Sequence, residues 1–321
     1  MGFDNALPEG LTTGEWLEAI AEIGEEQGYY SELDDNHAAL FVERDQNVLF
    51  VAFETVASAR AQSERRLPLA FDVCESRGWS HLTLLSHRDT WFRNAEVIDF
   101  FDRMVDDAFF EEFDQVIFYG AGSCGYAACA FSVAAPGSTV IAVAPQATLT
   151  RPLTAWDDRF PAMRRSDFTT RYGYAPDMLD AANQAFVIYD PEQPMDAMHA
   201  SHFEGRNISR FRYRRGDAAA IDADIRALGL VSLMADLAAR GTLSPATLGT
   251  AFRLRKRHVP YLRALLARVL DEDRPYLTAI LCRAVLRSHE LPRFRQHLDR
   301  AVKRLEADGR ALPRTTAREA V

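Results

Sequence analysis

The sequence has 321 residues, 48% of them hydrophobic, which is enough to bury the core of one large domain or of one and a half. No run of about 18 apolar residues occurs, and the first residues have neither a basic start nor an apolar stretch of signal length, so we expect a cytoplasmic protein without signal peptide or membrane contact. The four cysteines form no C-x-x-C pair, which argues against disulfides and zinc, and we expect no cofactor and no metal site.

The net charge of −9 is unevenly distributed. Residues 241–321 contain 17 Lys and Arg against 8 Asp and Glu, whereas the preceding 240 residues sum to −18. A basic helical segment suits nucleic acid or anionic lipid. Few aromatic residues lie among its arginines, which argues against nucleic acid, and we expect these charges to face water or the acidic part of the chain.

The first third of the chain predicts alternating helices and strands. An acidic N-terminal segment, residues 1–36, includes a helix over 13–27 whose apolar residues form one stripe. The elements that follow are strands over 37–42 and 47–53, a helix over 58–77, a strand over 80–85 and a helix over 91–110.

Residues 115–146 form the best-defined unit. An apolar strand over 116–119 ends in the glycine-rich turn 120–125, and a helix of small residues and a second buried strand, 139–144, follow. Such a unit is typical of a parallel sheet, in which ligands bind where strands end and helices begin.

Two chemistries use a glycine-rich turn at this place. Gly120, Gly122 and Gly125 fit the dinucleotide fingerprint G-x-G-x-x-G, although no carboxylate ends the next strand to hold a ribose. This pattern keeps open a nucleotide-binding oxidoreductase. The turn also fits a nucleophile elbow around Ser123, which has small neighbours two residues away on each side.

The segments 118–120, 125–128 and 144–146 resemble bacterial α/β-hydrolases whose elbow reads F-Y-G-S-S-x-G-G-Y-A-A-L and whose next strand ends in P-Q. An ungapped overlay places the nucleophile position on Gly122 and Ser123 one residue later. The resemblance implies an α/β fold, a mostly parallel, doubly wound sheet of α/β-hydrolase type over 37–240 with a C-terminal helical extension.

The resemblance also implies catalytic roles. Ser123 would attack a carbonyl, and N–H groups at Thr55 and Cys124 would hold the oxyanion. Asp190, which ends the predicted strand 185–189, would be the acid. Where the family has Gly-His, this sequence has Gly216-Asp217, so His199 or His202 would have to serve as the base.

The substrate site would lie around the same turn. The cap insertion, 149–177, mixes aromatic and arginine residues and would select a small polar substrate. The candidate binding residues are His87, Arg88, Trp91, Gly120, Gly122, Gly125 and Gln146.

The last part of the chain changes character. Residues 241–310 predict a run of helices, candidates for self-association or partner binding, before a loose tail over 311–321. Beside the nucleotide-binding alternative, three functions therefore stay open: an ester or acyl hydrolase, a catalytically degenerate binding protein, and a non-enzymatic scaffold acting through these helices.

The whole chain also resembles bacterial proteins labelled phosphoadenosine phosphosulfate reductases, which implies thiol-based reduction of a sulfonucleotide. That chemistry is associated with an S-G-G-K-D-S-like phosphate loop and an E-C-G-x-H motif, and the sequence contains neither. Cys282 lies in a predicted helix without the accompanying glycine or histidine. This activity is kept as one form of the nucleotide-binding alternative.

Overall fold

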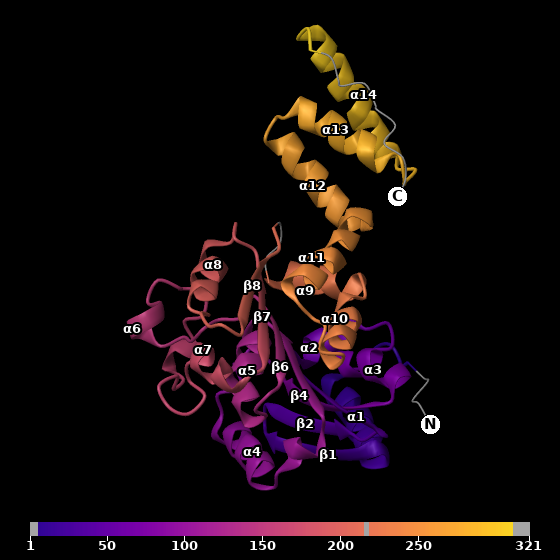
Figure 1. Cartoon of the computed structure of the whole chain (residues 1–321). Helices are drawn as coiled ribbons and strands as arrows, with labels where there is room; N and C mark the ends of the chain where they lie inside the picture. Colours follow the sequence, from indigo (N-terminus) through magenta and orange to yellow (C-terminus); the bar gives the residue numbers. More distant parts are fainter. Residues whose placement is uncertain (1–5, 215–217, 311–321) are drawn as a thin grey trace. The chain divides into compact units, whose positions relative to one another are not determined.

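The computed structural model describes residues 6–214 and 218–310, and the chain divides into two compact units, 1–251 and 252–321. The first unit is built on an eight-stranded sheet with the order β1-β2-β4-β3-β5-β6-β7-β8 (Figure 1). The strands are β1 (Gly28–Asp34), β2 (His37–Val42), β3 (Gln46–Thr55), β4 (Trp79–Ser86), β5 (Gln115–Ala121), β6 (Thr139–Val143), β7 (Gln184–Tyr189) and β8 (Ile208–Arg212).

The direction of the strands fixes where a ligand crevice can form. The pairs β1–β2 and β2–β4 are antiparallel, and every pairing from β4 through β3 to β8 is parallel. After β3 the chain continues into β4 on one side of β3, and it then crosses to β5 on the other side. The carboxyl ends of β3 and β5 therefore flank the topological switch point, where parallel sheets bind ligands.

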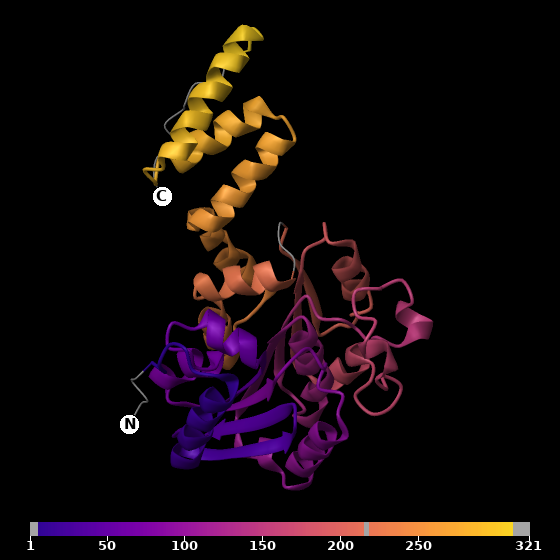
Figure 2. The same ribbon diagram turned by 180° about the vertical axis from the view of Figure 1, so that it is seen from behind.

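Both faces of the sheet are covered, because its buried strands alternate their side chains between two cores. Leu49, Val51 and Phe53 of β3 face one core, with α4 (Ala95–Asp106) and α5 (Ser123–Phe131). The other face carries α1 (Thr13–Gln27), which packs against β1 and β2 (Figure 2). Also on that face are α2 (Val56–Gln62), α3 (Leu69–Cys74), α9 (Ala218–Ala227) and α10 (Leu230–Ala239).

The predicted doubly wound sheet is confirmed, with three local differences. Residues 28–34 form the edge strand β1 where the sequence suggested only the end of a helix. The helix predicted over 58–77 is divided into α2 and α3, because Pro68 precedes Leu69 and disfavours helix before it. The helix predicted from Trp91 begins at Ala95, since Trp91 and Phe92 have φ of 52° and 54°.

The described part of the second unit, 252–310, begins with a 3₁₀ helix (Phe252–Arg257) and continues with the α-helices α12 (Val259–Asp271), α13 (Pro275–Val285) and α14 (Pro292–Ala307). Each of these α-helices has a proline in its first turn, where the missing N–H costs no helical hydrogen bond. Their shared core includes Leu262, Leu266, Val269, Cys282, Val285 and Phe294. The predicted tail, 311–321, lies outside the described residues. Throughout 6–214 and 218–310, each helix is too short or too polar to cross a lipid bilayer.

One buried histidine is expected to make the first unit sensitive to acid. His81 on β4 is 2% exposed, and its ring lies 4.7 Å from that of Phe71. Its Nε2 atom has no hydrogen-bond partner among the described residues. Burial, assisted by the charge of Arg44, lowers the pKa of His81 to about 3. Between the ordinary pKa of about 6.5 and that value, only the unfolded chain binds the proton, so stability falls as pH falls.

Replacement of this histidine should remove part of that acid sensitivity. We expect His81→Leu to reduce the loss of unfolding free energy by about 1.4 kcal/mol per pH unit between about pH 6 and 4. Urea denaturation at several pH values measures this slope, and His87→Gln, at an exposed histidine, is the matched control. An unchanged slope in His81→Leu would show that His81 is not the acid-sensitive group.

Candidate functional site

A sharp turn connects β5 to α5 at the carboxyl edge of the sheet. Its apex, Gly122, has φ 59° and ψ −123°, the conformation of the first central residue of a type II′ turn. A Cβ atom added at Gly122 would meet no atom within 4 Å. At Gly120 it would lie 2.1 Å from the carbonyl oxygen of Cys124, so this glycine lets α5 start directly against the strand. The apex thus has room for a side chain but carries none.

A cavity of about 230 Å³ lies over this turn, between the ends of β3 and β5. The cap, 149–177, which the structure describes in full, contributes nothing to its lining. The position of the cap therefore gives no support to its predicted role in substrate selection, and α9 borders the cavity instead. The lining residues are Phe53, Glu54, Thr55, Ser58, Gln62, Asp89, Ala121, Gly122, Ser123, Cys124, Asp222 and Arg226. We call this cavity the crevice.

Ser123, the candidate nucleophile, is the first residue of α5 and is 6% exposed. Its hydroxyl donates a hydrogen bond to Oδ1 of Asp89, at 2.5 Å. Among the described residues, no histidine forms a hydrogen bond with this hydroxyl. The neighbouring thiol of Cys124 is buried, and burial raises its pKa, so it stays protonated near neutral pH.

A buried ion cluster holds α9 beside the crevice. The Arg226 guanidinium donates from Nη1 to Glu54, at 2.8 Å, and from Nε to Asp222, at 2.9 Å. The Tyr119 hydroxyl donates to the other oxygen of Asp222, at 2.5 Å. Burial raises the pKa of Glu54, and Arg226 opposes this shift. Burial would lower the pKa of Arg226, but the attraction of Glu54 and Asp222 outweighs it and raises the pKa.

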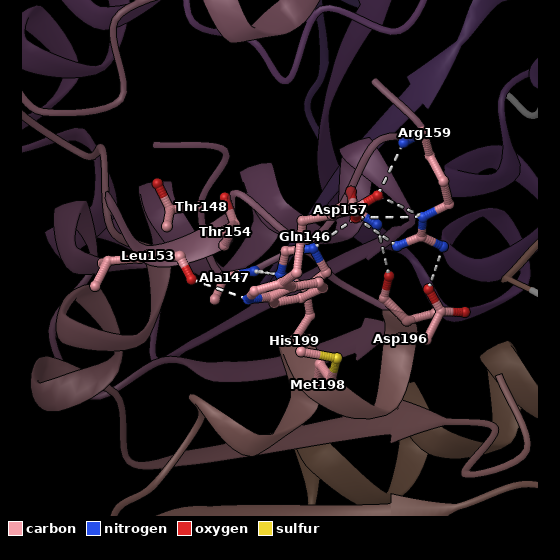
Figure 3. Close-up of polar contacts among 12 residues, drawn as sticks. Gln146, Ala147, Thr148, Leu153, Thr154, Asp157, Arg159, Asp196, Met198 and His199 are labelled. Carbon is pink, nitrogen blue, oxygen red and sulfur yellow. Dashed lines mark hydrogen bonds and ion pairs between the residues drawn. The ribbon is translucent and has the colours of Figure 1, made fainter. Parts of the chain in front are cut away.

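His199, the first candidate base, has both ring nitrogens occupied (Figure 3). Nδ1 accepts from the backbone N–H of Ala147, at 3.2 Å, and Nε2 donates to Oδ2 of Asp157, at 2.9 Å. Burial lowers the pKa of His199, and the Asp157 carboxylate opposes this shift. Arg159 bridges Asp157 and Asp196 on the far side of the pair. This arrangement leaves the imidazole no free lone pair to accept a proton from Ser123.

The other predicted catalytic residues also have different partners. His202 shares a hydrogen bond through Nδ1 with the Tyr174 hydroxyl, at 3.1 Å. Asp190 is buried and accepts from the backbone N–H of Glu192, at 2.8 Å. The structure therefore connects Ser123 to Asp89 rather than to Asp190, His199 or His202. Positions 216 and 217, where the family base would stand, lie outside the described residues.

Only some of the predicted oxyanion and binding residues line the crevice. Thr55 and Cys124 line the crevice, and the Thr55 side chain accepts from the N–H of Ser58, at 3.1 Å. Of the seven predicted binding residues, only Gly122 lines it. The others are the exposed His87 and Arg88, the buried Trp91 and Gln146, which bond to each other at 2.9 Å, and the packing glycines Gly120 and Gly125.

Sequence reasoning missed the charged lining of the crevice. Asp89 follows the predicted strand 80–85 with His87 and Arg88, which places it at the same edge of the sheet as the turn, but nothing local indicated that it would bond to Ser123. Asp222 and Arg226 form a helical i,i+4 pair, which was the one available signal. Their connection to Glu54 depends on tertiary folding.

His37 on β2 anchors the loop that follows β4 and carries Asp89. His37 Nδ1 lies 2.9 Å from both carboxylate oxygens of Asp34, and its Nε2 lies 2.6 Å from the Thr90 hydroxyl. Trp91 and Phe92 follow directly with positive φ, a strained conformation for bulky residues. These contacts hold a strained loop next to the crevice.

No protein-family model and no curated protein matches the sequence. Solved structures with a similar backbone include a hyperthermophilic esterase from the archaeon Pyrobaculum calidifontis, with 13% identity, TM-score 0.45 and coverage of 74% of this chain and 94% of that chain. An esterase of Pyrococcus furiosus has 10% identity, TM-score 0.41 and coverage of 64% and 87%. The thermostable carboxylesterase EstE1, cloned from a metagenomic library, has 11% identity, TM-score 0.39 and coverage of 76% and 99%.

All three TM-scores lie below 0.5, so the fold type is assigned from the order and direction of the strands in this chain. The sheet has two antiparallel pairings at one edge, β1–β2 and β2–β4, and parallel pairing from β4 onward. This arrangement is that of an α/β-hydrolase sheet. The tight turn at Gly122 follows the central strand β5, where the family places its nucleophile. By its strand order and by the position of this turn, the first unit has a fold of α/β-hydrolase type.

Proposed function

We propose that this protein binds a small polar molecule in the crevice without hydrolysing it. The observation that carries the proposal is Gly122, which occupies the apex of the turn, where the family nucleophile would stand, and has no side chain. Ser123, one residue later, belongs to α5 and is bonded to Asp89.

The surroundings of Ser123 support this proposal. A serine hydroxyl needs a base to become a nucleophile near neutral pH, and the usual base is an imidazole. Asp89 offers a carboxylate, which is a weaker base than an imidazole and a poor acceptor for the proton of an alcohol. The ring nitrogens of His199 are bound to Ala147 and Asp157.

The lining of the crevice supports a small polar ligand. Within the described part of the chain, the Ser58 hydroxyl and the Gln62 amide make no hydrogen bond to protein groups. Asp89 is exposed, and one of its oxygens is not used by Ser123. A ligand that donates to the carboxylate and exchanges hydrogen bonds with the hydroxyl and amide would satisfy these groups.

An ester hydrolysis assay tests whether Ser123 acts as a nucleophile. Wild-type protein and Ser123→Ala should hydrolyse p-nitrophenyl acetate, butyrate and octanoate at rates that agree within about twofold, because the hydroxyl is not activated. Thr250→Ala, which changes a hydroxyl in the first unit outside the crevice lining, is the matched control. A loss of about a hundredfold or more in Ser123→Ala alone would establish a serine hydrolase instead.

Fragment binding tests the binding role. We expect neutral and cationic polar fragments to give saturation-transfer NMR signals with wild-type protein, and Ser58→Phe, which fills the crevice, to remove them. Thr250→Phe is the control for non-specific effects of an added ring. Equal signals in wild-type protein and Ser58→Phe would show that the crevice is not the binding site.

A further inference from the structure

His199 lies where three segments of the first unit meet. The imidazole belongs to α8 (Pro194–Ser201), while its hydrogen-bond partners, Ala147 and Asp157, lie in the loop after β6 and in the cap. The side chains of His199 and Asp157 are both fully buried. An ionised carboxylate can only accept, so the proton of the neutral ring is on Nε2. Nδ1 then presents a lone pair to the N–H of Ala147 (Figure 3).

The carboxylates near the ring offset part of the cost of a second proton, although burial keeps the pKa of His199 below its ordinary value. Arg159 contacts both Asp157, at 2.8 Å, and Asp196, at 2.7 Å, so a single cation balances two buried carboxylates. A proton on His199 would neutralise the remaining negative charge. Burial, Arg159 and His202 act against that proton, and Asp157 favours it.

A second proton would nevertheless break one hydrogen bond. Protonated Nδ1 is a donor, and the N–H of Ala147 is also a donor, so the two groups would face each other without an acceptor. Such a buried pair costs free energy until one group moves away. Because Asp157 continues to hold the ring through Nε2, we expect the backbone at Ala147 to be the group that leaves its present position.

The backbone at Ala147 is connected to the crevice through hydrogen bonds and strained residues. Its neighbour Gln146 accepts from the Trp91 indole N–H, at 2.9 Å. Ala144, Trp91 and Phe92 have φ of 43°, 52° and 54°, conformations that persist only while surrounding contacts enforce them. Trp91 lies two residues after Asp89, the partner of Ser123 in the crevice.

We propose that His199 is an acid-sensitive latch: the neutral ring holds the loop after β6, and protonation of Nδ1 releases Ala147 and relaxes the strained loop that carries Asp89. The latch itself is independent of what the crevice does. Its effect on ligand affinity rests on the proposed binding function.

Hydrogen exchange at pH values from about 7.5 to 5 tests the latch, because the ordinary histidine pKa is about 6.5 and the pKa of His199 is lower. After correction for intrinsic exchange, we expect protection of the Ala147 amide to fall about tenfold or more over this range in wild-type protein. His199→Gln keeps a neutral side chain and should lose this step. His202→Gln, three residues later, should keep it, with its midpoint moved upward because a neighbouring positive charge is removed.

Histidine-selective NMR of wild-type protein supplies a readout that a purely structural role would not change. At neutral pH, the His199 ring should show the tautomer with its proton on Nε2, and Nδ1 should gain a proton together with the loss of Ala147 protection. If Ala147 stays protected after Nδ1 is protonated, or if the step persists in His199→Gln, the latch does not exist. Since no ligand enters either measurement, its failure would leave the binding proposal untouched.

Discussion

Arg226→Met is expected to lower the free energy of unfolding by about 3–5 kcal/mol, because it leaves Glu54 and Asp222 buried beside the crevice without their cation. The side chain of Glu54 is fully buried, so solvent cannot replace the guanidinium. Urea denaturation at neutral pH, followed by circular dichroism, measures the change.

Two further variants separate the effect of unpaired buried charges on stability from the effect of losing an arginine side chain. The triple variant with Arg226→Met, Glu54→Gln and Asp222→Asn removes the unpaired charges, and it should recover much of the stability. Arg210→Met is the matched single control, because the ion pair of Arg210 with Glu204 is exposed and spans 3.8 Å. It should change stability by less than about 1 kcal/mol. An equally small change in Arg226→Met would mean that the cluster does not hold α9.

Two glycines in the same turn should respond very differently to alanine. Gly120→Ala places its Cβ 2.1 Å from the Cys124 carbonyl oxygen, a backbone atom that cannot move unless α5 shifts. We expect a loss of about 3 kcal/mol or more, the upper range for overpacking, or failure to fold. Gly122→Ala has free space and incurs only the strain of a sparsely populated backbone conformation, about 1–3 kcal/mol.

Thermal unfolding of the two variants side by side makes this comparison. The ratio of the two losses in unfolding free energy is more informative than either loss alone, because both substitutions add one methyl group to the same turn. Equal effects would show that α5 does not start as closely against β5 as described. A larger effect at Gly122 would contradict its assignment as an open apex.

The part of the fold that the sequence predicted well is held together by local signals. The unit β5–α5–β6 combines two short apolar runs, a glycine turn and a helix of small residues, and each signal lies within the segment that it describes. The edge strand β1 was missed because its burial depends on pairing with β2, and its own pattern of side chains is mixed.

The site was harder to predict because it is assembled from distant segments. The sequence placed Gly122 and Ser123 in the turn, and the crevice lies over them. The Ser123 partner, Asp89, is 34 residues earlier, and Arg226 is 172 residues beyond Glu54. His199 was proposed as a base from its place after the β7 strand, but its two ring nitrogens are committed to Ala147 and Asp157, neither of which a local pattern reveals.

The long separation between Glu54 and its cation has a consequence for biosynthesis. A ribosome adds about 5–20 residues per second, so the 172 residues between the two partners take about 10–30 s to emerge. Throughout that interval Arg226 cannot pair with the Glu54 carboxylate, which must remain hydrated. The first unit therefore completes its interior only after α9 has left the exit tunnel, late in translation rather than strand by strand.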